Sequence, residues 1–420
     1  MLYFKGNTCY TKLSVIISIK IEMNMNSEIK DFDVIVVYSE SVANSPRDEQ
    51  YREKSPFSSK GSHEGYNDSY RYFLLRCQKM GVEAAFVSSK DIIGPGFFQS
   101  FWTYDEEWIR NDGQAHSQVI FDKFTPSSVK QENKLRLLTS SKSVRLFNNK
   151  IIKDIFQNKL STYGHFDEFA IPTVEINSPQ KRKIVLAKGR LDKLFKSHKN
   201  GIDFQDGHVL KDKTGVSGYK IYKVDFAKAG LKEIVQHYRS DRKVKEILSY
   251  ILQPFINCNR GFVFGKYQGF IDLRVIILKN KIIQTYIRIA KRGEFRCNEH
   301  QGGNLVYMKL KTIPHDVRAM TKKIISKLST KLDLEHSLYS LDYIRSNNGN
   351  LYFLEGNSNP GIDWDHSKKI NERKSKELIN IIVDELKSIY LSKESDKPAT
   401  MIPNFDFGLE TPLPVTVSPQ

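Results

Sequence analysis

Cysteine is scarce in the 420-residue sequence, and the four cysteines are scattered without a CxxC pair. A disulfide framework or a structural zinc site needs cysteines at close, regular spacings, so the sequence indicates neither. Long hydrophobic runs are lacking as well. The apolar stretch at residues 13–19 is interrupted by Lys20 and Glu22 far short of a bilayer span, and no small-residue cleavage site follows it. We therefore expect a cytoplasmic protein without a membrane partner.

Two common nucleotide-binding motifs are also missing. No glycine-rich fingerprint follows the first expected strand at residues 33–39, which argues against a dinucleotide-binding domain. The glycine-containing segment at residues 212–218 lacks both the GxxxxGK spacing and the following helix of a Walker A loop. A role in nucleotide binding would need a different kind of site.

The chain is strongly basic, with a formal net charge of +17. This charge favours anionic partners such as nucleotide phosphates, acidic peptides or nucleic acid. No nucleic-acid motif accompanies it, and lysines occur in every segment, so a generally basic surface is favoured over a dedicated RNA-binding face. The sequence leaves the oligomeric state open, a homo-oligomer included.

The expected elements divide the chain into four parts. Residues 1–30 are expected to form a flexible extension, and the proline-containing residues 392–420 a disordered tail. We expect residues 31–150 to form a small α/β domain with a largely parallel sheet, because apolar strands alternate with a helical segment in β-α-β order. Its elements are expected at residues 33–39, 70–80, 82–88 and 119–121.

Residues 151–391 form the larger part, and their sequence pattern predicts a domain that contains both helices and strands. Helices are expected at residues 151–169, 312–332 and 368–391, and strands at residues 171–176, 208–211, 219–224, 250–256, 270–278 and 282–289. A hairpin is expected at residues 338–354, because two alternating runs flank Asn348-Gly349, one of the strongest hairpin signals.

This hairpin carries oxygen donors. Asp342 lies in its first strand, while Glu355 and Asn357 leave the second strand with one residue between them and therefore point the same way. Carboxylates and an amide carbonyl without a Cys or His cluster suit a hard cation such as Mg²⁺. The alternative is an ordinary exposed hairpin with solvated acidic residues.

Charged residues also interrupt the apolar hairpin at residues 270–289. Asp272 and Arg274 alternate on one strand and Arg288 lies near the end of the other. Such charges are costly unless they are paired or face a ligand, so a structural salt bridge and a ligand site both remain open. Lys211, where a strand enters the glycine loop, could contact phosphate, and the basic, glycine-rich residues 290–303 are suited to an anion.

These residues together, in this order along the chain, resemble the ATP-grasp carboxylate–amine ligases, in particular the branch of ribosomal-protein glutamate ligases and glutathione-synthetase-like enzymes. The resemblance covers roughly residues 151–391 and is strongest from Asp272 onward, through His300-Gln-Gly-Gly303 to Glu355-Gly-Asn-Ser-Asn-Pro-Gly361. It implies an ATP-grasp fold of two α+β subdomains with the nucleotide between them.

The resemblance also implies roles for individual residues. The nucleotide would contact Lys159, Lys211, Gly215, Ser217, Gly218, Gln253, Pro254, Phe255, Ile256 and Asp272, with adenine against residues 253–256. Two Mg²⁺ ions, or Mn²⁺, would be held by Asp342, Glu355 and Asn357. Pro254 stands where these relatives often carry Glu, which puts one polar contact to the nucleotide in doubt.

The implied activity is formation of an amide or peptide bond from a small-molecule or peptide carboxylate and an amine. The carboxylate would attack the γ-phosphate of ATP, and the amine would then attack the acylphosphate. Arg288, Arg296 and Asn298 would stabilise the developing charge. Two alternatives remain, namely a phosphotransferase that acts on a hydroxyl and a non-catalytic ATP-binding regulator, because a fold does not fix a function.

Overall fold

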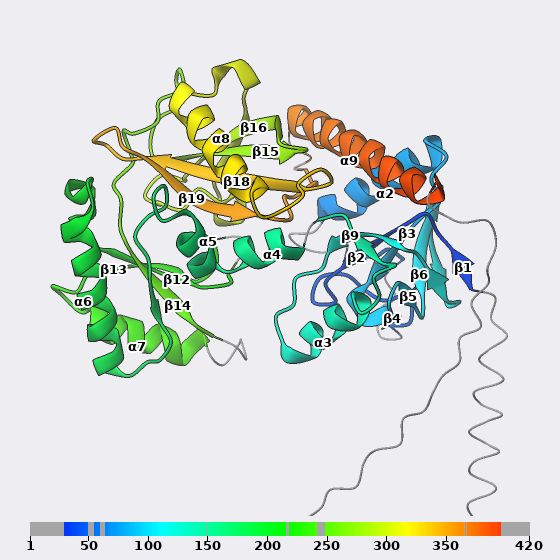
Figure 1. Ribbon diagram of the computed structural model, residues 1–420, viewed down its shortest axis with the longest axis horizontal. Coiled ribbons are helices and arrows are strands. Elements are labelled where there is room, and N and C mark those ends of the chain that lie inside the picture. The colour runs from blue at the N-terminus through cyan, green and yellow to red at the C-terminus, as the bar shows by residue number, and fades with distance from the viewer. Residues whose placement is uncertain are drawn as a thin grey trace, which may run out of the picture.

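The computed structural model of the protein describes residues 29–48, 54–58, 64–148, 150–215, 218–241, 248–364, 366 and 368–395. Figure 1 shows two lobes, one built from the N-terminal residues and one from the green and yellow segments that follow α4. The long helix α9 (Lys369–Ser395) returns from the second lobe to lie beside α2 (Glu64–Lys79) of the first. The predicted extension lies outside the described residues up to residue 28, and the predicted tail does so from residue 396.

The N-terminal lobe is centred on a sheet of the order β10-β9-β2-β3-β6-β7. Four of its strands are parallel neighbours, as predicted, because α2 carries the chain from β2 (Val34–Tyr38) across to β3 (Ala84–Ser88). The remaining strands are β6 (Phe101–Asp105), β7 (Glu107–Asn111), β9 (Val119–Lys123) and β10 (Arg145–Leu146), and the helix α3 (Val129–Leu138) follows β9.

A small second sheet in this lobe was not predicted. It has the order β1-β8-β5-β4, with β1 (Lys30–Asp31), β4 (Ile92–Gly94), β5 (Phe97–Phe98) and β8 (Ala115–His116). These strands are two or three residues long, too short to show a period in the sequence. Lys30, which was predicted to belong to the extension, pairs with Ala115 in this sheet.

The predicted helix at residues 151–169 is wrong in its length. The structure has two helices there, α4 (Lys150–Gln157) and α5 (Lys159–Phe166). Asn158 separates them, because its side chain accepts hydrogen bonds from the backbone N–H groups of Leu160 and Ser161 and so caps α5. As a result Lys159 begins a helix instead of lying within one.

A four-stranded antiparallel sheet of the order β11-β14-β12-β13 follows. Its strands are β11 (Val174–Ile176), β12 (His208–Asp212), β13 (Ile221–Val224) and β14 (Tyr250–Pro254). The helices α6 (Lys181–Ser197) and α7 (Gly230–Asp241) pack on it and share its core, and neither was predicted. Together these elements form the smaller subdomain beside the central cavity.

The largest sheet of this lobe has the order β17-β16-β15-β18-β19 and is antiparallel throughout. Its strands are β15 (Ile271–Leu278), β16 (Lys281–Ile289), β17 (Asn304–Tyr307), β18 (Leu338–Arg345) and β19 (Leu351–Asn357), with α8 (His315–Ser329) packed against it. Both predicted hairpins are therefore confirmed. Short 3₁₀ helices occur at Ser89–Asp91, Gly201–Phe204, Glu299–Gln301 and Leu310–Thr312.

One hydrophobic cluster joins the two lobes. It contains Val36 and Phe73 of the N-terminal lobe, Leu278 of the large sheet, and Ile382 and Leu386 of α9. Polar contacts reinforce it, since Tyr72 donates a hydrogen bond to Asn380 Oδ1 (3.1 Å) and Lys387 to the carbonyl of Met80 (2.7 Å). The C-terminal helix therefore covers the N-terminal lobe as well as its own.

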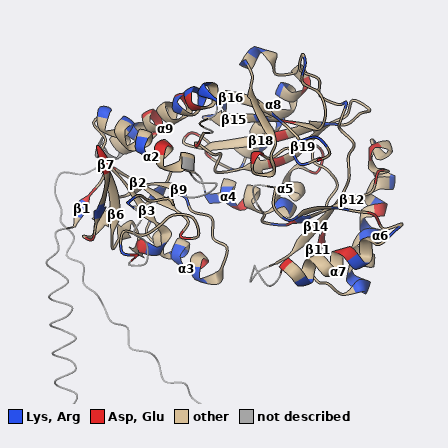
Figure 2. Cartoon of the chain, turned by 180° about the vertical axis from the view of Figure 1, so that it is seen from behind, with Lys and Arg blue, Asp and Glu red and all other residues tan. Residues whose placement is uncertain are grey.

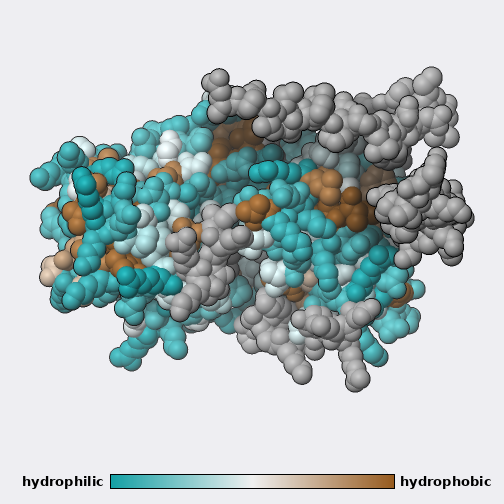
Figure 3. Space-filling model, turned by 90° about the horizontal axis from the view of Figure 1, so that it is seen from below, coloured by the Kyte–Doolittle hydropathy of each residue, from teal (hydrophilic) through white to brown (hydrophobic). Residues whose placement is uncertain are grey.

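The surface agrees with the composition. Figure 2 shows Lys and Arg on α3, α6, α8 and α9, that is, on both lobes, and on the face in Figure 3 hydrophilic residues predominate among those that the structure describes. In the same part of the chain, every helix is too short or too polar to cross a lipid bilayer.

Candidate active site

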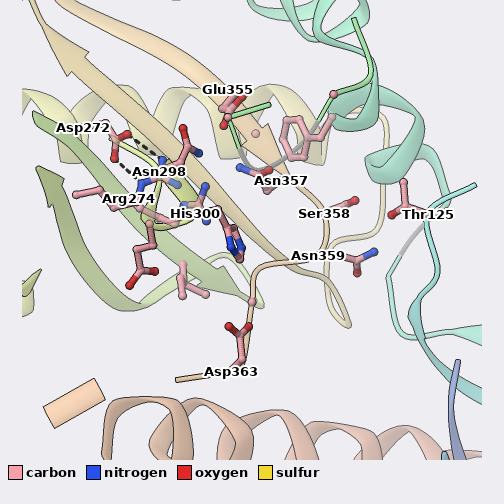
Figure 4. Close-up of a pocket in the computed structure, with 18 of the residues that line it drawn as sticks. Thr125, Asp272, Arg274, Asn298, His300, Glu355, Asn357, Ser358, Asn359 and Asp363 are labelled. Atoms are coloured by element: carbon pink, nitrogen blue, oxygen red, sulfur yellow. Dashed lines mark hydrogen bonds and ion pairs between the residues drawn. The ribbon is translucent and has the colours of Figure 1, made fainter. Parts of the chain in front are cut away.

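A cavity of about 350 Å³ lies where the two lobes and the smaller subdomain meet. Its walls come from β12 and the loop after it, from β15, β16 and β19, from the start of α5, and from β2, α2 and β9 of the N-terminal lobe. Figure 4 shows Asp272 and Arg274 of β15 and Glu355 and Asn357 of β19 among the side chains at the cavity. Most residues that the sequence singled out line this cavity, so the structure brings together residues far apart in the chain.

The three predicted metal ligands lie at one place on the large sheet but differ in exposure. Asp342 is opposite Glu355 in the pairing of β18 with β19, and Ser340 is opposite Asn357. Glu355 and Asn357 line the cavity. Asp342 is completely buried, and its two carboxylate oxygens bind arginine side chains. The Asn357 Nδ2 atom is buried and has no hydrogen-bond partner among the described residues.

The side chains of Glu355 and Asn357 alone are a suitable set of oxygen donors for Mg²⁺. Within the described residues, no group of three or more His, Cys, Asp and Glu side chains is arranged to hold a metal ion. Mg²⁺ commonly binds to one or two side-chain oxygens and completes its shell with phosphate and water. Glu355 and Asn357 meet that requirement, while Asp342 would have to exchange an arginine for the ion. The role of these residues in metal binding stays a prediction.

Two aspartates and two arginines form a buried chain of ion pairs next to Glu355 and Asn357. Arg288 donates to Asp272 (2.7 Å from Nε) and to Asp342 (2.6 Å from Nη2), and Arg274 binds Asp342 in a bidentate manner (2.6 Å from both Nε and Nη2). The sequence left a salt bridge and a ligand site open here, and the structure shows the salt bridges. Asp272, Arg274 and Arg288 also line the cavity, so their polar atoms remain close to any bound molecule.

The two aspartates respond differently to this environment. Burial raises the pKa of Asp272 to about 6, although Arg288 opposes the shift. Burial also acts to raise the pKa of Asp342, but Arg274 and Arg288 together outweigh it and hold that pKa below its usual value. Asp342 is thus a firmly ionised partner of both arginines.

Lysines line the side of the cavity formed by the smaller subdomain. The Lys211 side chain lines this side, and burial lowers its pKa to about 8, against the opposing charge of Glu355. Lys159 donates a hydrogen bond to the carbonyl of Gly215. The lysine ammonium groups and Glu355 therefore face one another across the cavity.

The glycine loop closes against the basic segment. Gly215 and Gly218 line the cavity, and Ser217 lies outside the described residues. Gly218 has a φ of +74°, and a Cβ atom added there would lie 2.6 Å from Asn298 Oδ1. Only glycine fits, for both the backbone conformation and the space. Asn298, a predicted catalytic residue, also lines the cavity.

Besides the buried Asp342, five predicted site residues that the structure describes do not line the cavity. Gln253, Pro254, Phe255 and Ile256 are buried, and Gln253 donates a hydrogen bond to Thr173 Oγ1 (2.8 Å). Arg296 pairs with Glu294 (3.0 Å) outside the cavity wall. Contacts of these residues with a nucleotide or an intermediate stay predictions.

The sequence reasoning missed a second group of cavity residues. They are Tyr38, Tyr66, Tyr70, Lys123 and Thr125 of the N-terminal lobe, and Glu299 and Asp363 of the second lobe. Lys123 Nζ donates a hydrogen bond to the carbonyl of Pro360 (2.8 Å), which fixes the turn after β19 against β9. Asp363 follows that turn by only a few residues. Its position shortly after the predicted ligands Glu355 and Asn357 could therefore have indicated that it lies at the same cavity. For the tyrosines there was none, because tyrosine on a strand or helix usually belongs to a core.

Comparison with known proteins places this geometry in context. A family model described as the RimK-like ATP-grasp domain matches residues 175–382. A probable alpha-L-glutamate ligase of Legionella pneumophila is 35% identical over 120 residues, which are 28% of this chain and 33% of that protein. Probable alpha-L-glutamate ligase 2 of Hahella chejuensis is 31% identical over 139 residues, which are 31% and 41% of the two chains. The chain thus spans about a third to two fifths of the length of these relatives.

Solved structures show the same fold over a longer stretch. D-alanyl-alanine synthetase A of Vibrio cholerae has a TM-score of 0.52 at 12% identity, covering 87% of this chain and 98% of its own. D-alanine–D-alanine ligase of Bacillus anthracis, in complex with ATP, has a TM-score of 0.50 at 11% identity, covering 87% and 99%. At such identities the likeness concerns the fold alone. The predicted α/β class and the predicted resemblance to ATP-grasp proteins are confirmed.

Proposed function

We propose that this chain, which carries a RimK-like ATP-grasp domain over residues 175–382, is an ATP-dependent ligase that joins a carboxylate to an amine. The observation that supports it most is the convergence in one cavity of Glu355 and Asn357, of Lys159 and Lys211, and of the glycine loop. The names of the relatives, which are probable glutamate ligases, point in the same direction.

Each part of the cavity has a task in this reaction. Lys159, Lys211 and the loop of Gly215 and Gly218 would bind the phosphates of ATP, because they offer positive charge and a backbone that approaches closely. Glu355 and Asn357 would hold Mg²⁺, which neutralises phosphate charge when bound.

The reaction then needs no nucleophilic side chain. An oxygen of the substrate carboxylate bonds to the γ-phosphorus as the bond to ADP breaks, giving an acylphosphate and ADP. The neutral amine next bonds to the acyl carbon, the carbon–oxygen bond to phosphate breaks, and the departing inorganic phosphate takes up the proton that the amine nitrogen loses. Arg288 and Asn298 lie at the cavity wall, where their N–H groups would stabilise the oxyanion. The contact of Gly218 with Asn298 would help to keep water from the acylphosphate.

Trapping with hydroxylamine tests the proposal. Hydroxylamine attacks acylphosphates, so the full chain with Mg-ATP, hydroxylamine and a panel of amino acids and acidic peptides is expected to form a hydroxamate while releasing ADP. A phosphorylated alcohol without a hydroxamate would instead show a phosphotransferase. ATP binding without ADP release from any acid would show a regulator.

Substitution of Lys211 by alanine is expected to reduce kcat/KM for ATP by roughly ten- to a hundredfold, through both a higher KM and a lower kcat, since a phosphate contact strengthens in the transition state. Steady-state ADP release measures this effect. Lys193→Ala on the exposed face of α6 removes the same charge elsewhere and is the control. Equal behaviour of the two variants would remove Lys211 from the site.

The pH dependence of the same parameter offers a separate check. The pKa of Lys211 is lowered to about 8, so the free protein loses this positive charge as the pH rises through that value. We expect kcat/KM for ATP to fall above a pH of about 8, because this parameter reports ionisation of the free enzyme. In Lys211→Arg the guanidinium stays charged, and the fall should move to higher pH. A profile that does not differ between the two proteins would contradict this assignment.

A further inference from the structure

The end of the cavity away from Glu355 has a chemistry of its own. In Figure 4, Asp363 lies on the far side of His300 from Glu355 and points into the cavity. Around it are Tyr38, Tyr66 and Tyr70 of the N-terminal lobe and Glu299 of the 3₁₀ helix before β17. The proposed phosphate and metal contacts do not use these residues, so this end is available to a substrate.

The aromatic side chains form one wall. The ring of Tyr38 packs against those of Tyr70 (5.6 Å between centroids) and Tyr66 (6.1 Å). Nearby negative charge from Asp363 contributes to a raised pKa at all three hydroxyls, after the larger effect of burial. The tyrosines are therefore neutral, and they lie within electrostatic reach of the Asp363 carboxylate.

The carboxyl groups of Glu299 and Asp363 lie near this wall, since both line the cavity and act electrostatically on Tyr66. Withdrawal from water raises the pKa of Glu299 to about 7, and the charge of Asp363 is the next contribution, so the two carboxyl groups are close enough to repel. The positive groups at this end are Lys123, His300 and Lys368. Lys123 donates a hydrogen bond to the Pro360 carbonyl and its charge also acts on Asp363, while Lys368 donates to Asn304 Oδ1. Arg274 and Arg288 are already matched by Asp342 and Asp272.

We infer that this end of the cavity binds the amine substrate as an ammonium ion, between the carboxyl groups of Glu299 and Asp363 and the tyrosine wall of Tyr38, Tyr66 and Tyr70. The inference rests on the proposed ligase function and names the class of its second substrate, an amine with an uncharged, aromatic or aliphatic body. Carboxylates attract the ammonium group, and tyrosine faces attract cations and cover an apolar body.

The same charges act against glutamate as the amine. Its side-chain carboxylate would have to lie beside Glu299 and Asp363, with no unpaired arginine at this end among the described residues to receive it. At a partly desolvated site, repulsion between like charges can exclude a competing ligand, just as a favourable contact can select the correct ligand. The acceptor would therefore differ from the glutamate in the names of the relatives.

Binding of two probes to the full chain tests the inference without requiring turnover. Isothermal titration at about pH 8 should show tyramine, an ammonium with a neutral aromatic body, binding at least about tenfold more tightly than L-glutamate. Glu299→Gln and Asp363→Asn should each weaken tyramine binding by about tenfold, and lowering the pH to about 6 should weaken it in the wild type as Glu299 takes up a proton. Glu168→Gln, which removes an exposed carboxylate on the surface, should change nothing.

Each other result would overturn the inference. Glutamate binding as tightly as tyramine, no tyramine binding at all, or unchanged binding in both acidic-residue variants would do so. Failure of the ligase proposal is distinguishable, because it appears as a lack of hydroxamate and ADP in the trapping experiment and leaves the tyramine titration unaffected. Conversely, a hydroxamate together with a preference for glutamate would keep the ligase and reject this acceptor site.

Discussion

Replacement of Arg288 by alanine is expected to lower the free energy of unfolding by roughly 3–5 kcal/mol, because it leaves two buried carboxylates without their shared partner. Arg288 bridges Asp272 and Asp342, which are exposed by only 3% and 0%. Asp342 is sealed from water, Asp272 is exposed only at the cavity wall, and Arg274 can compensate for Asp342 alone. The loss should therefore be far larger than for a surface ion pair.

Urea denaturation of the two proteins at neutral pH measures this loss. Arg71→Ala is the control, since Arg71 pairs with Asp68 at the exposed surface of α2 and its removal should cost less than about 1 kcal/mol. The deficit of Arg288→Ala should shrink as the pH falls from about 8 to about 5. Without the cation, the folded variant binds protons more readily than the folded wild type, and acid favours the state that binds more protons. A loss no greater than that of Arg71→Ala would show that the buried network contributes little.

Replacement of Glu355 by glutamine is expected to reduce turnover by about a thousandfold or more while leaving the fold intact. If Glu355 and Asn357 are the side chains that hold Mg²⁺, loss of the carboxylate removes the stronger of two ligands, and metal stabilisation of phosphate charge is worth several kcal/mol in the transition state. Glutamine has nearly the same shape, and Glu355 is only partly buried, so stability should change little.

ADP release at saturating ATP over a series of Mg²⁺ concentrations provides the measurement. The variant should also need more Mg²⁺ to bind ATP, which equilibrium binding detects without turnover. Glu377→Gln, on the exposed side of α9, is the matched control. Ordinary turnover of Glu355→Gln at ordinary Mg²⁺ would rule out Glu355 as a metal ligand.

The hairpins of the large sheet could be predicted because their signals are local. Asn348-Gly349 fixes the turn between β18 and β19, with Gly349 at a φ of +86°, and alternation fixes which side chains share a face. That is why Glu355 and Asn357 were expected together and are found together at the cavity. The environment of Asp342, by contrast, depends on which strands pair in the sheet. Only when β15 lies beside β18 does Arg274 oppose Asp342, and no feature of either segment alone indicates this.

The unpredicted parts have different causes. The helices α6 and α7 are amphipathic and pack their apolar side chains against the sheet under them, so a helical period was present in the sequence and the prediction missed it. The tyrosine wall needs β2 and α2 of one lobe to face residues near Asp363 of the other. Contacts between the two lobes do not affect the local sequence pattern, so the sequence alone does not predict them.

The course of α9 has a consequence for how the protein is made. Its Ile382 and Leu386 complete the same core as Val36 and Phe73 of the N-terminal lobe, yet they lie near the opposite end of the chain. During synthesis the N-terminal sheet leaves the ribosome long before the helix that covers it. Until α9 emerges, that sheet and α2 expose apolar surface that the finished molecule hides. A nascent or truncated chain is therefore prone to aggregate and to engage chaperones, and the native N-terminal lobe is completed only after α9 has been translated.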